Sequence, residues 1–205
     1  MTTHKGSQES KEKIARAALR LFARKGYATA SLEEIATQAG FTKGAVYHFF
    51  KSKEALLLSL LRDIEERSIG KTTLALDQAD GGAMDRLVRF KNLQAQWAAR
   101  NADDLAILIW VSIESAHRKS AVRTQVSHIY ARIEGALTGI VEAGMKSGEF
   151  PADLPVADVV TWLISLHDGN MLSWYRSGRD PEVGRRLTRA SRQAAQMAIR
   201  LGQIA

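Results

Sequence analysis

Ser-Leu-Glu-Glu-Ile-Ala-Thr-Gln-Ala-Gly-Phe-Thr-Lys-Gly-Ala-Val-Tyr-His-Phe-Phe-Lys-Ser-Lys, residues 31–53, is the stretch that decides the fold. Ser31 and Glu34 have the spacing of a capping box, in which each side chain accepts a hydrogen bond from the other residue's backbone N–H. The apolar residues that follow share one helical face: Leu32, Ile35, Ala36 and Ala39. Gly40 suits the left-handed position that ends a helix, and Thr42 suits the cap of the next one. The stretch therefore predicts two helices joined by a tight turn.

The second of these helices has few side chains that need burial. Only Val46 and Phe50 are clearly core residues, so Lys43, Tyr47 and His48 are left on a polar, cationic outer face. A short second helix with such a face is what entry into the DNA major groove requires. The pattern predicts a helix-turn-helix.

Length and composition limit the remaining possibilities. The chain has 205 residues, 45% of them hydrophobic, which suits one or two globular domains with a sizeable core. It has no cysteine, so disulfides, a thiolate nucleophile and Cys-ligated metals are excluded. The longest apolar run, Leu105–Val111, is far shorter than the roughly 20 residues of a membrane span, and the N-terminus has no apolar signal-peptide core. We expect a cytoplasmic protein with no membrane partner.

The net charge is concentrated near the predicted helix-turn-helix. Residues 1–55 contain ten Lys or Arg and five Asp or Glu, so they carry five of the seven net positive charges of the chain. A basic surface on its own is most often just a solvated face, but together with a groove-reading motif it favours nucleic acid.

The rest of the chain is predicted to be helical, with no strand pattern and no internal repeat. Residues 1–9 lack an apolar period and are predicted to be a disordered arm, either an inert tail or a basic extension that touches DNA. Residues 10–55 are expected to form the DNA-binding domain, and residues 56–205 a second helical domain. One helix, from about Ser52 to Gln78, links the two. Further helices are predicted at 84–100, 104–118, 120–147, 155–176 and 181–202, which makes about nine in an all-α fold.

The N-terminal quarter resembles the TetR/AcrR family of bacterial transcriptional regulators. The resemblance covers residues 10–60 and rests on these positions at the family's spacing: Ile14, Ala17, Ala18, Leu21, Phe22, Lys25, Gly26, Tyr27, Ser31, Ile35, Ala36, Ala39, Gly40, Lys43, Gly44, Val46, Tyr47, His48, Phe50, Ser52, Lys53, Glu54, Ala55 and Leu56. Two positions depart from it, because Ala30 stands where the family often has Thr and Phe49 stands where a second His is common. The C-terminal part agrees only in length, helical character and the pair Asp168-Gly169.

The resemblance implies a homodimer that binds double-stranded operator DNA and is released by a small molecule. It also implies DNA contacts at Ser31, Thr42, Lys43, Gly44, Ala45, Tyr47, His48 and Lys53. Ser31, Thr42, Tyr47 and Lys53 match positions that contact the DNA backbone. Lys43 and His48 are the best placed to reach base edges, and the small residues Gly44 and Ala45 allow close approach. For Ser31 and Thr42, capping alone is the simpler role, and it is compatible with a phosphate contact.

The last two predicted helices are the expected dimer interface. In helix 181–202, the residues Val183, Leu187, Ala190, Ala194, Met197 and Leu201 alternate by four and three, and Ala190, Ala194, Ala198 and Gly202 recur every four. Helix 155–176 would add Val159, Val160, Leu163 and Leu166 to a four-helix interface across a two-fold axis. The alternative is that these residues form a core stripe within one chain.

Candidate ligand contacts come from aromatic and polar residues outside the DNA-binding part. A few polar groups among aromatic rings favour a planar amphiphilic molecule, and the candidates are Trp110, Glu114, His117, His128, Tyr130, Trp162, His167, Asn170 and Trp174. The alternative is that they are ordinary core residues, with Glu114 paired to Arg118. The helix at 104–118 is apolar all round over 105–113, so we expect it to be central.

Enzyme signatures are absent from the sequence. It has no HExxH motif, no phosphate-binding glycine loop and no nucleophile elbow, and the neighbours His167 and Asp168 would diverge by about 100° on a helix. We therefore expect no enzyme activity, no cofactor and no metal. The sequence favours a ligand-responsive repressor over an activator or a ligand-independent regulator. A non-specific nucleoid-type DNA binder and a helical ligand-binding protein with a vestigial helix-turn-helix remain as alternatives.

Overall fold

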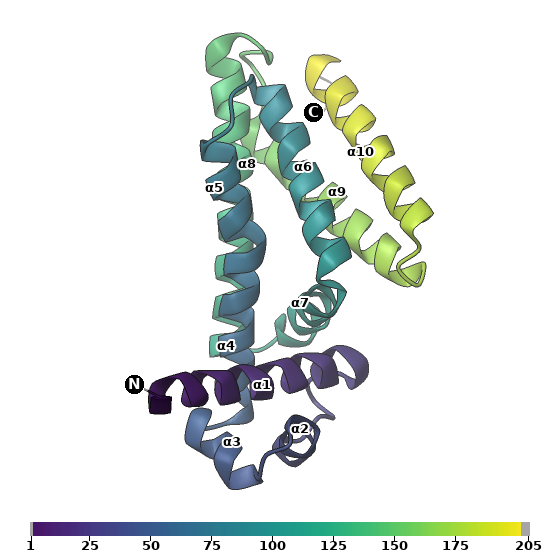
Figure 1. Cartoon of the computed structure of the whole chain (residues 1–205). Helices are drawn as coiled ribbons and strands as arrows, with labels where there is room; N and C mark the ends of the chain where they lie inside the picture. Colours follow the sequence, from purple (N-terminus) through teal and green to yellow (C-terminus); the bar gives the residue numbers. More distant parts are fainter. Residues whose placement is uncertain (1, 202–205) are drawn as a thin grey trace. The chain divides into compact units, whose positions relative to one another are not determined.

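The structure of the chain is a computed structural model that describes residues 2–201, with side chains for residues 6–199. The bounds of its helices, shown in Figure 1, are α1 (Thr2–Lys25), α2 (Leu32–Ala39), α3 (Lys43–Phe49), α4 (Lys53–Glu65), the π-helical turn η1 (Glu66–Gly70), α5 (Lys71–Asp77), α6 (Ala83–Arg100), α7 (Ala102–Ser115), α8 (Ala121–Ser147), α9 (Val156–Arg176) and α10 (Pro181–Leu201). Because α4, η1 and α5 are continuous, these residues form nine helical segments without a strand, and the all-α prediction is confirmed. No helix among them is long and apolar enough to cross a membrane.

Internal contacts divide the chain into two compact units. The first comprises Met1–Ile64 and Asp103–Ser127, and the second comprises Glu65–Ala102 and His128–Ala205. The N-terminal helices thus group with α7 and the start of α8, which a division based on residue order alone does not anticipate.

The first unit contains the small core predicted from the helix stripes. In Figure 1, α1 lies across α2 and α3. The buried side chains of this unit include an apolar stripe on α1 and residues that the sequence predicts for the inner faces of α2 and α3, each 4% exposed or less: Ile14, Ala17, Ala18, Leu21, Phe22, Ile35, Ala36, Val46 and Phe50. Burying a large side chain of this kind contributes roughly 1.5–3 kcal/mol, so the three stripes together fix the angle between α2 and α3.

Two expectations for this unit are corrected. Residues 2–9 were expected to be a disordered arm, but α1 already begins at Thr2. Two local hydrogen bonds of exposed side chains accompany this part of the helix: Gln8 Nε2 donates to the Glu12 carboxylate at 3.1 Å, and Ser10 Oγ donates to the Gly6 carbonyl at 2.8 Å. Met1 lies outside the described residues.

The second correction concerns α7, which was expected to be central along its whole apolar stretch. Leu105–Leu108 are buried, but Trp110 is 46% exposed and Ile113 is 60% exposed in the single chain. Apolar residues on all sides of this helix led to the expectation that it is buried throughout, but its own chain covers only part of it.

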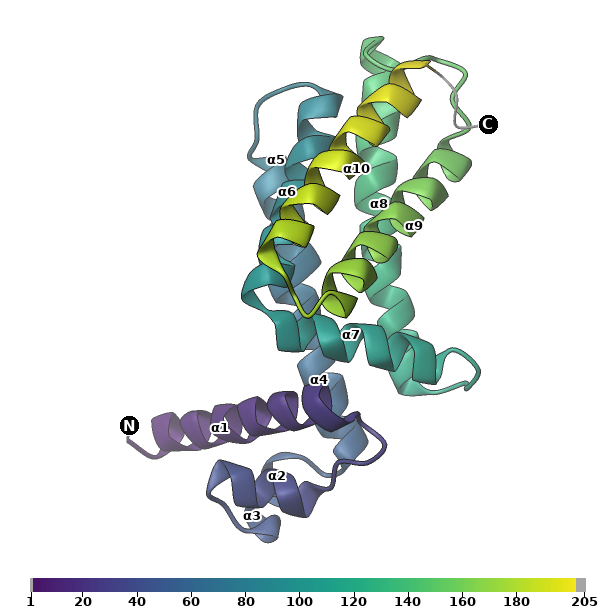
Figure 2. The same ribbon diagram turned by 90° about the vertical axis from the view of Figure 1, so that its right-hand side faces the viewer.

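The second unit contains α6, α9 and α10, which lie next to one another in Figure 2. The first turn of α6 is capped by the distant Glu149, whose carboxylate accepts from the backbone N–H groups of Ala83 and Met84. Near the end of α8, Gly144 leaves room for the Phe150 ring, because a Cβ at Gly144 would lie 2.3 Å from the ring atom Cδ2. These contacts fix the ends of α6 and α8.

The inward face of α10 differs from the predicted dimer seam. Ser191, Ala195 and Ile199 are buried within the chain. Three positions of the predicted seam are instead exposed, namely Ala190, Ala194 and Met197. The side chain of Leu201 and the residue Gly202 lie outside the described residues.

The part of the seam assigned to α9 is corrected. Val159, Val160 and Leu163 are at most 3% exposed in the single chain, so they are core residues and not a free face. A stripe read from sequence spacing does not distinguish an intrachain neighbour from a partner chain, because both need the same apolar residues.

The π-helical turn η1 follows Glu65, a carboxylate that is 7% exposed. Oε1 of Glu65 accepts from Arg132 Nη1 at 2.8 Å and lies 3.1 Å from His128 Nδ1. Burial raises the pKa of Glu65, but the hydrogen bonds from Arg132 and His128 outweigh that effect and leave the pKa below its ordinary value. Glu65 thus remains charged and ties α4 to α8.

Candidate nucleic-acid interface and ligand cavity

The N-termini of α2 and α3 have the caps that the sequence predicts. Ser31 Oγ accepts from the Glu34 backbone N–H at 3.2 Å, and the Glu34 carboxylate accepts from the Ser31 N–H at 2.9 Å, which completes the capping box. The Lys25 ammonium and then the Ser31 donors lower the pKa of Glu34 to about 2. Thr42 Oγ1 accepts from the Ala45 N–H at 3.2 Å. Gly40 ends α2 at φ 76°, which favours glycine.

The outer face of α3 is open to solvent. Val46 and Phe50 are buried as predicted, whereas Lys43, Gly44 and His48 are exposed. Tyr47 is 46% exposed, a large fraction for an aromatic side chain.

The small residues of α3 leave space on this face. A Cβ added at Gly44 would have Thr42 Oγ1, at 3.9 Å, as its nearest neighbour, so packing within the chain does not require a glycine there. Close approach of another molecule is the remaining physical reason for a glycine inside a short helix, where it costs about 1 kcal/mol relative to alanine. Ala45 beside it is half-buried.

The lysines around the motif differ in how closely they are paired with acidic side chains. The Lys43 ammonium lies 3.7 Å from Glu33, and both side chains are more than half exposed, so the pair is weak and Lys43 is available to another anion. Lys25 is engaged by Glu34.

Lys53 is the most constrained of the predicted DNA contacts. Its ammonium donates to the carbonyl oxygens of Tyr27, Ala28 and Ala30 at 2.9, 3.2 and 2.9 Å. It also lies 4.5 Å from the centroid of the Tyr27 ring. An ammonium has three donors, and all three are used here. The sequence contained no sign of this arrangement, because the contacting carbonyls belong to the backbone more than twenty residues earlier.

The predicted ligand residues fall into separate places. His167, Asn170 and Trp174 line a cavity of 860 Å³ between α6, α9 and α10 in the second unit. Trp110 and Glu114 of α7 and His117 in the turn after it are exposed and belong to the first unit.

The other three predicted ligand residues belong to the second unit but do not line this cavity. His128 contacts Glu65, and Trp162 is half-buried on α9. The Tyr130 hydroxyl donates to Asp168 Oδ1 at 3.3 Å. Burial, more than the hydrogen bond and charge of Asp168, raises the pKa of Tyr130 above its usual value, so the phenol is a neutral donor.

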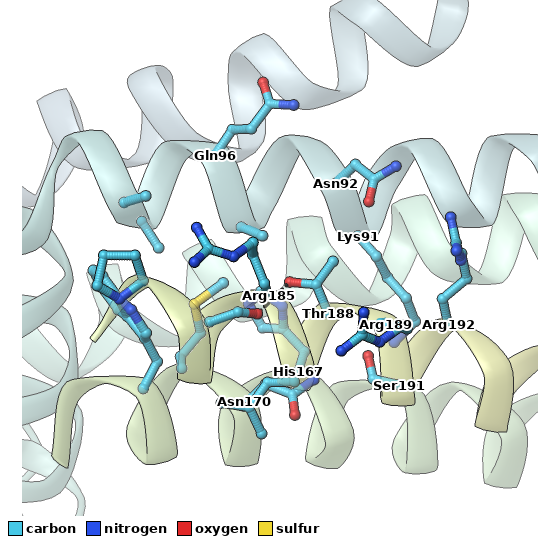
Figure 3. A pocket seen from close by; sticks show the side chains of 18 of the residues that line it. Lys91, Asn92, Gln96, His167, Asn170, Arg185, Thr188, Arg189, Ser191 and Arg192 are labelled. Atoms are coloured by element: carbon cyan, nitrogen blue, oxygen red, sulfur yellow. Dashed lines mark hydrogen bonds between the residues drawn. The ribbon is translucent and has the colours of Figure 1, made fainter. Parts of the chain in front are cut away.

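Cationic residues of the cavity were missed by sequence reasoning. They are Lys91 of α6 and Arg179, Arg185, Arg189 and Arg192 at or beside α10, several of which are labelled in Figure 3. The sequence did contain a signal for Lys91, because this charged residue shares the buried face of α6 with Leu87, Gln94 and Ala98. On this face, Gln94 Nε2 donates a hydrogen bond to Thr72 Oγ1 at 2.8 Å. Helical spacing alone does not reveal which polar residue of the face points into a cavity.

The described residues contain no cluster of three or more His, Asp or Glu side chains that could share a metal ion.

Two family models match the chain. One, described as bacterial regulatory proteins of the tetR family, matches residues 14–60. The other, described as a tetracyclin repressor-like C-terminal domain, matches residues 83–191. The boundary of the first model encloses α2, α3 and the capping box.

Individual proteins are similar over nearly the same extent. The HTH-type transcriptional regulator AcrR of Shigella flexneri is 30% identical over 179 residues, which cover 84% of this chain and 81% of AcrR. The crystal structure of the MbdR regulator from Azoarcus sp. CIB has a TM-score of 0.80 at 30% identity, covering 96% of this chain and 100% of MbdR. A transcriptional regulator from Saccharomonospora viridis, solved in complex with choline, has a TM-score of 0.78 at 26% identity, covering 94% and 96% of the two chains.

Proposed function

We infer the function of this chain from one premise, which is that it belongs to the tetR family of bacterial regulatory proteins and is a DNA-binding transcription regulator with a helix-turn-helix. We propose that it is a repressor that acts in the cytoplasm. In this proposal a homodimer binds a palindromic operator, and a small-molecule effector releases it by changing the spacing of the two DNA-binding domains.

The exposed face of α3 carries the DNA part of the proposal. Tyr47 and His48 project from a helix whose N-terminus is capped by Thr42, and Lys43 supplies an exposed positive charge that is only weakly paired with Glu33. We assign Lys43 and His48 to base edges. We assign Tyr47 and the N-terminal turns at Ser31 and Thr42 to phosphates, with Gly44 and Ala45 permitting close approach.

Lys53 holds the DNA-binding motif in position in this proposal. Its three donors hold the turn between α1 and α2 against the start of α4, and a phosphate contact would require breaking these bonds. We therefore propose that Lys53 fixes the orientation of the motif without touching DNA.

The exposed residues of α10 support the dimer part of the proposal. Ala190, Ala194 and Met197 lie on the face opposite the buried Ser191 and Ala195, and small residues at a spacing of four allow close helix approach. A two-fold axis through this face would relate the two copies of α3 in a dimer by the same symmetry, which is why a palindromic operator is proposed.

The effector part of the proposal is supported by the cavity between α6, α9 and α10. The similar regulator from Saccharomonospora viridis was solved with a small molecule, choline, although the groups of the cavity in this chain suit a different ligand.

Thermodynamic linkage gives the test of induction. All four tryptophans, Trp97, Trp110, Trp162 and Trp174, lie outside residues 1–55, so intrinsic fluorescence reports binding away from α3. A chemical library would be titrated against the free protein, and each binder would be titrated again against the operator-bound protein. An inducer must bind the free protein more tightly, by the same factor by which it weakens operator binding.

Two other outcomes of the ligand titration, and one outcome of a DNA titration, have distinct meanings. A binder that strengthens operator binding would indicate a corepressor or an activator. Binders with equal affinity for both forms would indicate a ligand-independent regulator. Equal affinity for operator and random duplex would leave the nucleoid-type alternative in place of the repressor.

A further inference from the structure

Lys91 is a buried cation without a partner among the described residues. Its side chain comes from α6, is 9% exposed and lines the cavity. Within the described part of the chain, no hydrogen bond or ion pair is formed by its ammonium, and the hydroxyl of the neighbouring Ser191, 5% exposed, has no hydrogen-bond partner either. Figure 3 shows the Lys91 side chain extending from α6 toward Arg189 and Ser191 of α10.

No acidic residue lines the cavity to balance this charge. The twenty lining residues include five cations, Lys91, Arg179, Arg185, Arg189 and Arg192, and no Asp or Glu. Of these cations, Arg185 pairs with Glu182 at 2.7 Å, and the carboxylate of Asp168 accepts the hydrogen bond of Tyr130, so neither acidic group pairs with Lys91. An unpaired ammonium in such a place is costly, and a bound anion would remove the cost.

At neutral pH, Lys91 is charged inside the cavity and His167 is neutral. Burial lowers the pKa of Lys91 to about 8, which leaves the ammonium mainly protonated at neutral pH. Burial and then the charge of Lys91 lower the pKa of His167 to about 4, so its ring is neutral at pH 7 and offers one donor and one acceptor. Lys91 is therefore the internal charge of the cavity, whereas Arg189 and Arg192 are exposed at its rim.

Apolar side chains also line the cavity. Ala98, Ala99, Met171, Trp174 and Pro181 line it, and Trp174 is held in place beside Gly184, where a Cβ would lie 3.1 Å from the indole. The cationic lining thus matches a negative head group, and the apolar lining matches a hydrocarbon or aromatic body.

We propose that this cavity binds an amphipathic anion, with its carboxylate or phosphate head on Lys91, Ser191 and the rim arginines and its apolar body against Trp174 and the α6 alanines. The inference rests on the proposed effector response, because it names the chemical class of that ligand. A cationic molecule such as choline would be repelled by the same end of the cavity.

The test uses four probes that share a decyl chain and differ in the head group. Decanoate, decyl phosphate, decanol and decyltrimethylammonium would each be titrated into the full-length protein by calorimetry, below their micelle concentrations. Both anions, or one of them, should bind at least about tenfold more tightly than decanol, since a hydrogen bond to a charged group contributes that much. The cation should bind most weakly. Equal binding of all four probes would overturn the inference, as would tighter binding of the cation or the absence of anion binding.

Variants separate the role of Lys91 from general attraction. Lys91→Met keeps the length of the side chain and removes its charge, so it should weaken anion binding about tenfold and leave decanol binding unchanged. Lys91→Arg should restore most of the affinity. The control is Lys71→Met, at an exposed lysine of α5 outside the cavity, which should bind like the wild type. If both Lys→Met variants behave alike, the site is wrongly assigned.

Operator binding, measured in the same samples, distinguishes the two proposals. If the anions bind through Lys91 but do not change operator affinity, the cavity inference stands and the proposed induction fails. If operator DNA is released by a ligand that does not depend on Lys91 while the anions fail to bind, the proposed function stands and the cavity inference fails.

Discussion

The ammonium of Lys53 donates to the carbonyl oxygen of Tyr27 at 2.9 Å and lies 4.5 Å from the centroid of its ring. This contact joins the first residue of α4 to the turn that follows α1, so one side chain connects the two helices that enclose α2 and α3. A lysine at the edge of a DNA-binding motif is therefore a structural residue of that motif.

Lys53 and Lys43 should respond differently to loss of charge. Lys53→Met leaves three carbonyls without their donor and should lower the free energy of unfolding by about 1–3 kcal/mol. The slope of log affinity against log salt should not change, because no phosphate contact is lost. Lys43→Met should leave stability nearly unchanged and reduce the slope by about one unit per chain if Lys43 neutralises a phosphate, or relax base preference if it reads a base edge.

Denaturant unfolding and salt-dependent fluorescence anisotropy on operator DNA check both variants. A reduced salt slope in Lys53→Met with wild-type stability would show that Lys53 contacts DNA directly.

The two glycines Gly144 and Gly139 of α8 should give opposite results when each is changed to alanine. At Gly144 the new methyl would overlap the Phe150 ring, and overpacking of this kind costs about 1–3 kcal/mol. At Gly139 no atom lies within 4 Å of an added Cβ, so the better helix propensity of alanine should stabilise the protein by roughly 1 kcal/mol. Thermal unfolding should show a lower Tm for the first variant and a higher Tm for the second. Changes in the same direction would be inconsistent with the packing described here.

The exposed face of α10 should control dimer formation. Met197→Glu places a charge on a side chain that is 64% exposed in the single chain, so it should cost the monomer little. In a dimer across this face, two buried carboxylates would repel each other, and sedimentation should show monomers. Gln78→Glu adds the same charge at an exposed position outside α10 and serves as the control, which should remain a dimer. A dimeric Met197→Glu protein would place the interface elsewhere.

Stability should depend on pH through Asp168. Burial raises the pKa of its carboxyl from 3.8 to about 6, despite the hydrogen bond from Tyr130 that acts in the opposite direction. The folded state therefore holds the proton more tightly than the unfolded chain, and this group reduces the free energy of unfolding as pH rises from about 4 to about 6.

Asp168→Asn removes that dependence, since an amide has no charge to bury. The difference in free energy of unfolding between the variant and the wild type should be small near the lower end of this window, grow through it and become constant above it. The neighbouring His167 acts in the opposite sense, because its lowered pKa of about 4 makes stability rise with pH between about 4 and 6.5. Its contribution is common to both proteins and cancels in the difference. A difference that does not vary with pH would mean that Asp168 is ionised in the folded protein throughout.

The sequence was most informative where local rules decide the structure. The capping box of Ser31 and Glu34, the left-handed Gly40 and the cap at Thr42 depend on residues within a few positions of one another, and each is confirmed. Burial of Val46 and Phe50 followed from helical period alone. These features determine α2 and α3 before any long-range contact is known.

Long-range relationships were not predictable in the same way. The partners of Lys53 are backbone carbonyls, which leave no trace in residue type. Val159, Val160 and Leu163 read equally well as core or interface, and the structure places them in the core. Trp110 and Trp174 were equivalent candidates by composition, but one is exposed on α7 and the other lines the cavity. Lys91 was overlooked because a lone lysine on an apolar helix face signals a cavity only once its neighbours are known.

Selection of a binding site from a pool of random duplexes, followed by titration of the selected duplex, tests the central claim most directly. A dimeric repressor of this kind should enrich one palindromic sequence, bind it with two chains per duplex and show a slope of roughly −8 for log affinity against log salt, if each chain engages four to five phosphates. Failure to enrich any sequence, or binding that is insensitive to salt, would contradict the account of α3 as the operator-reading helix.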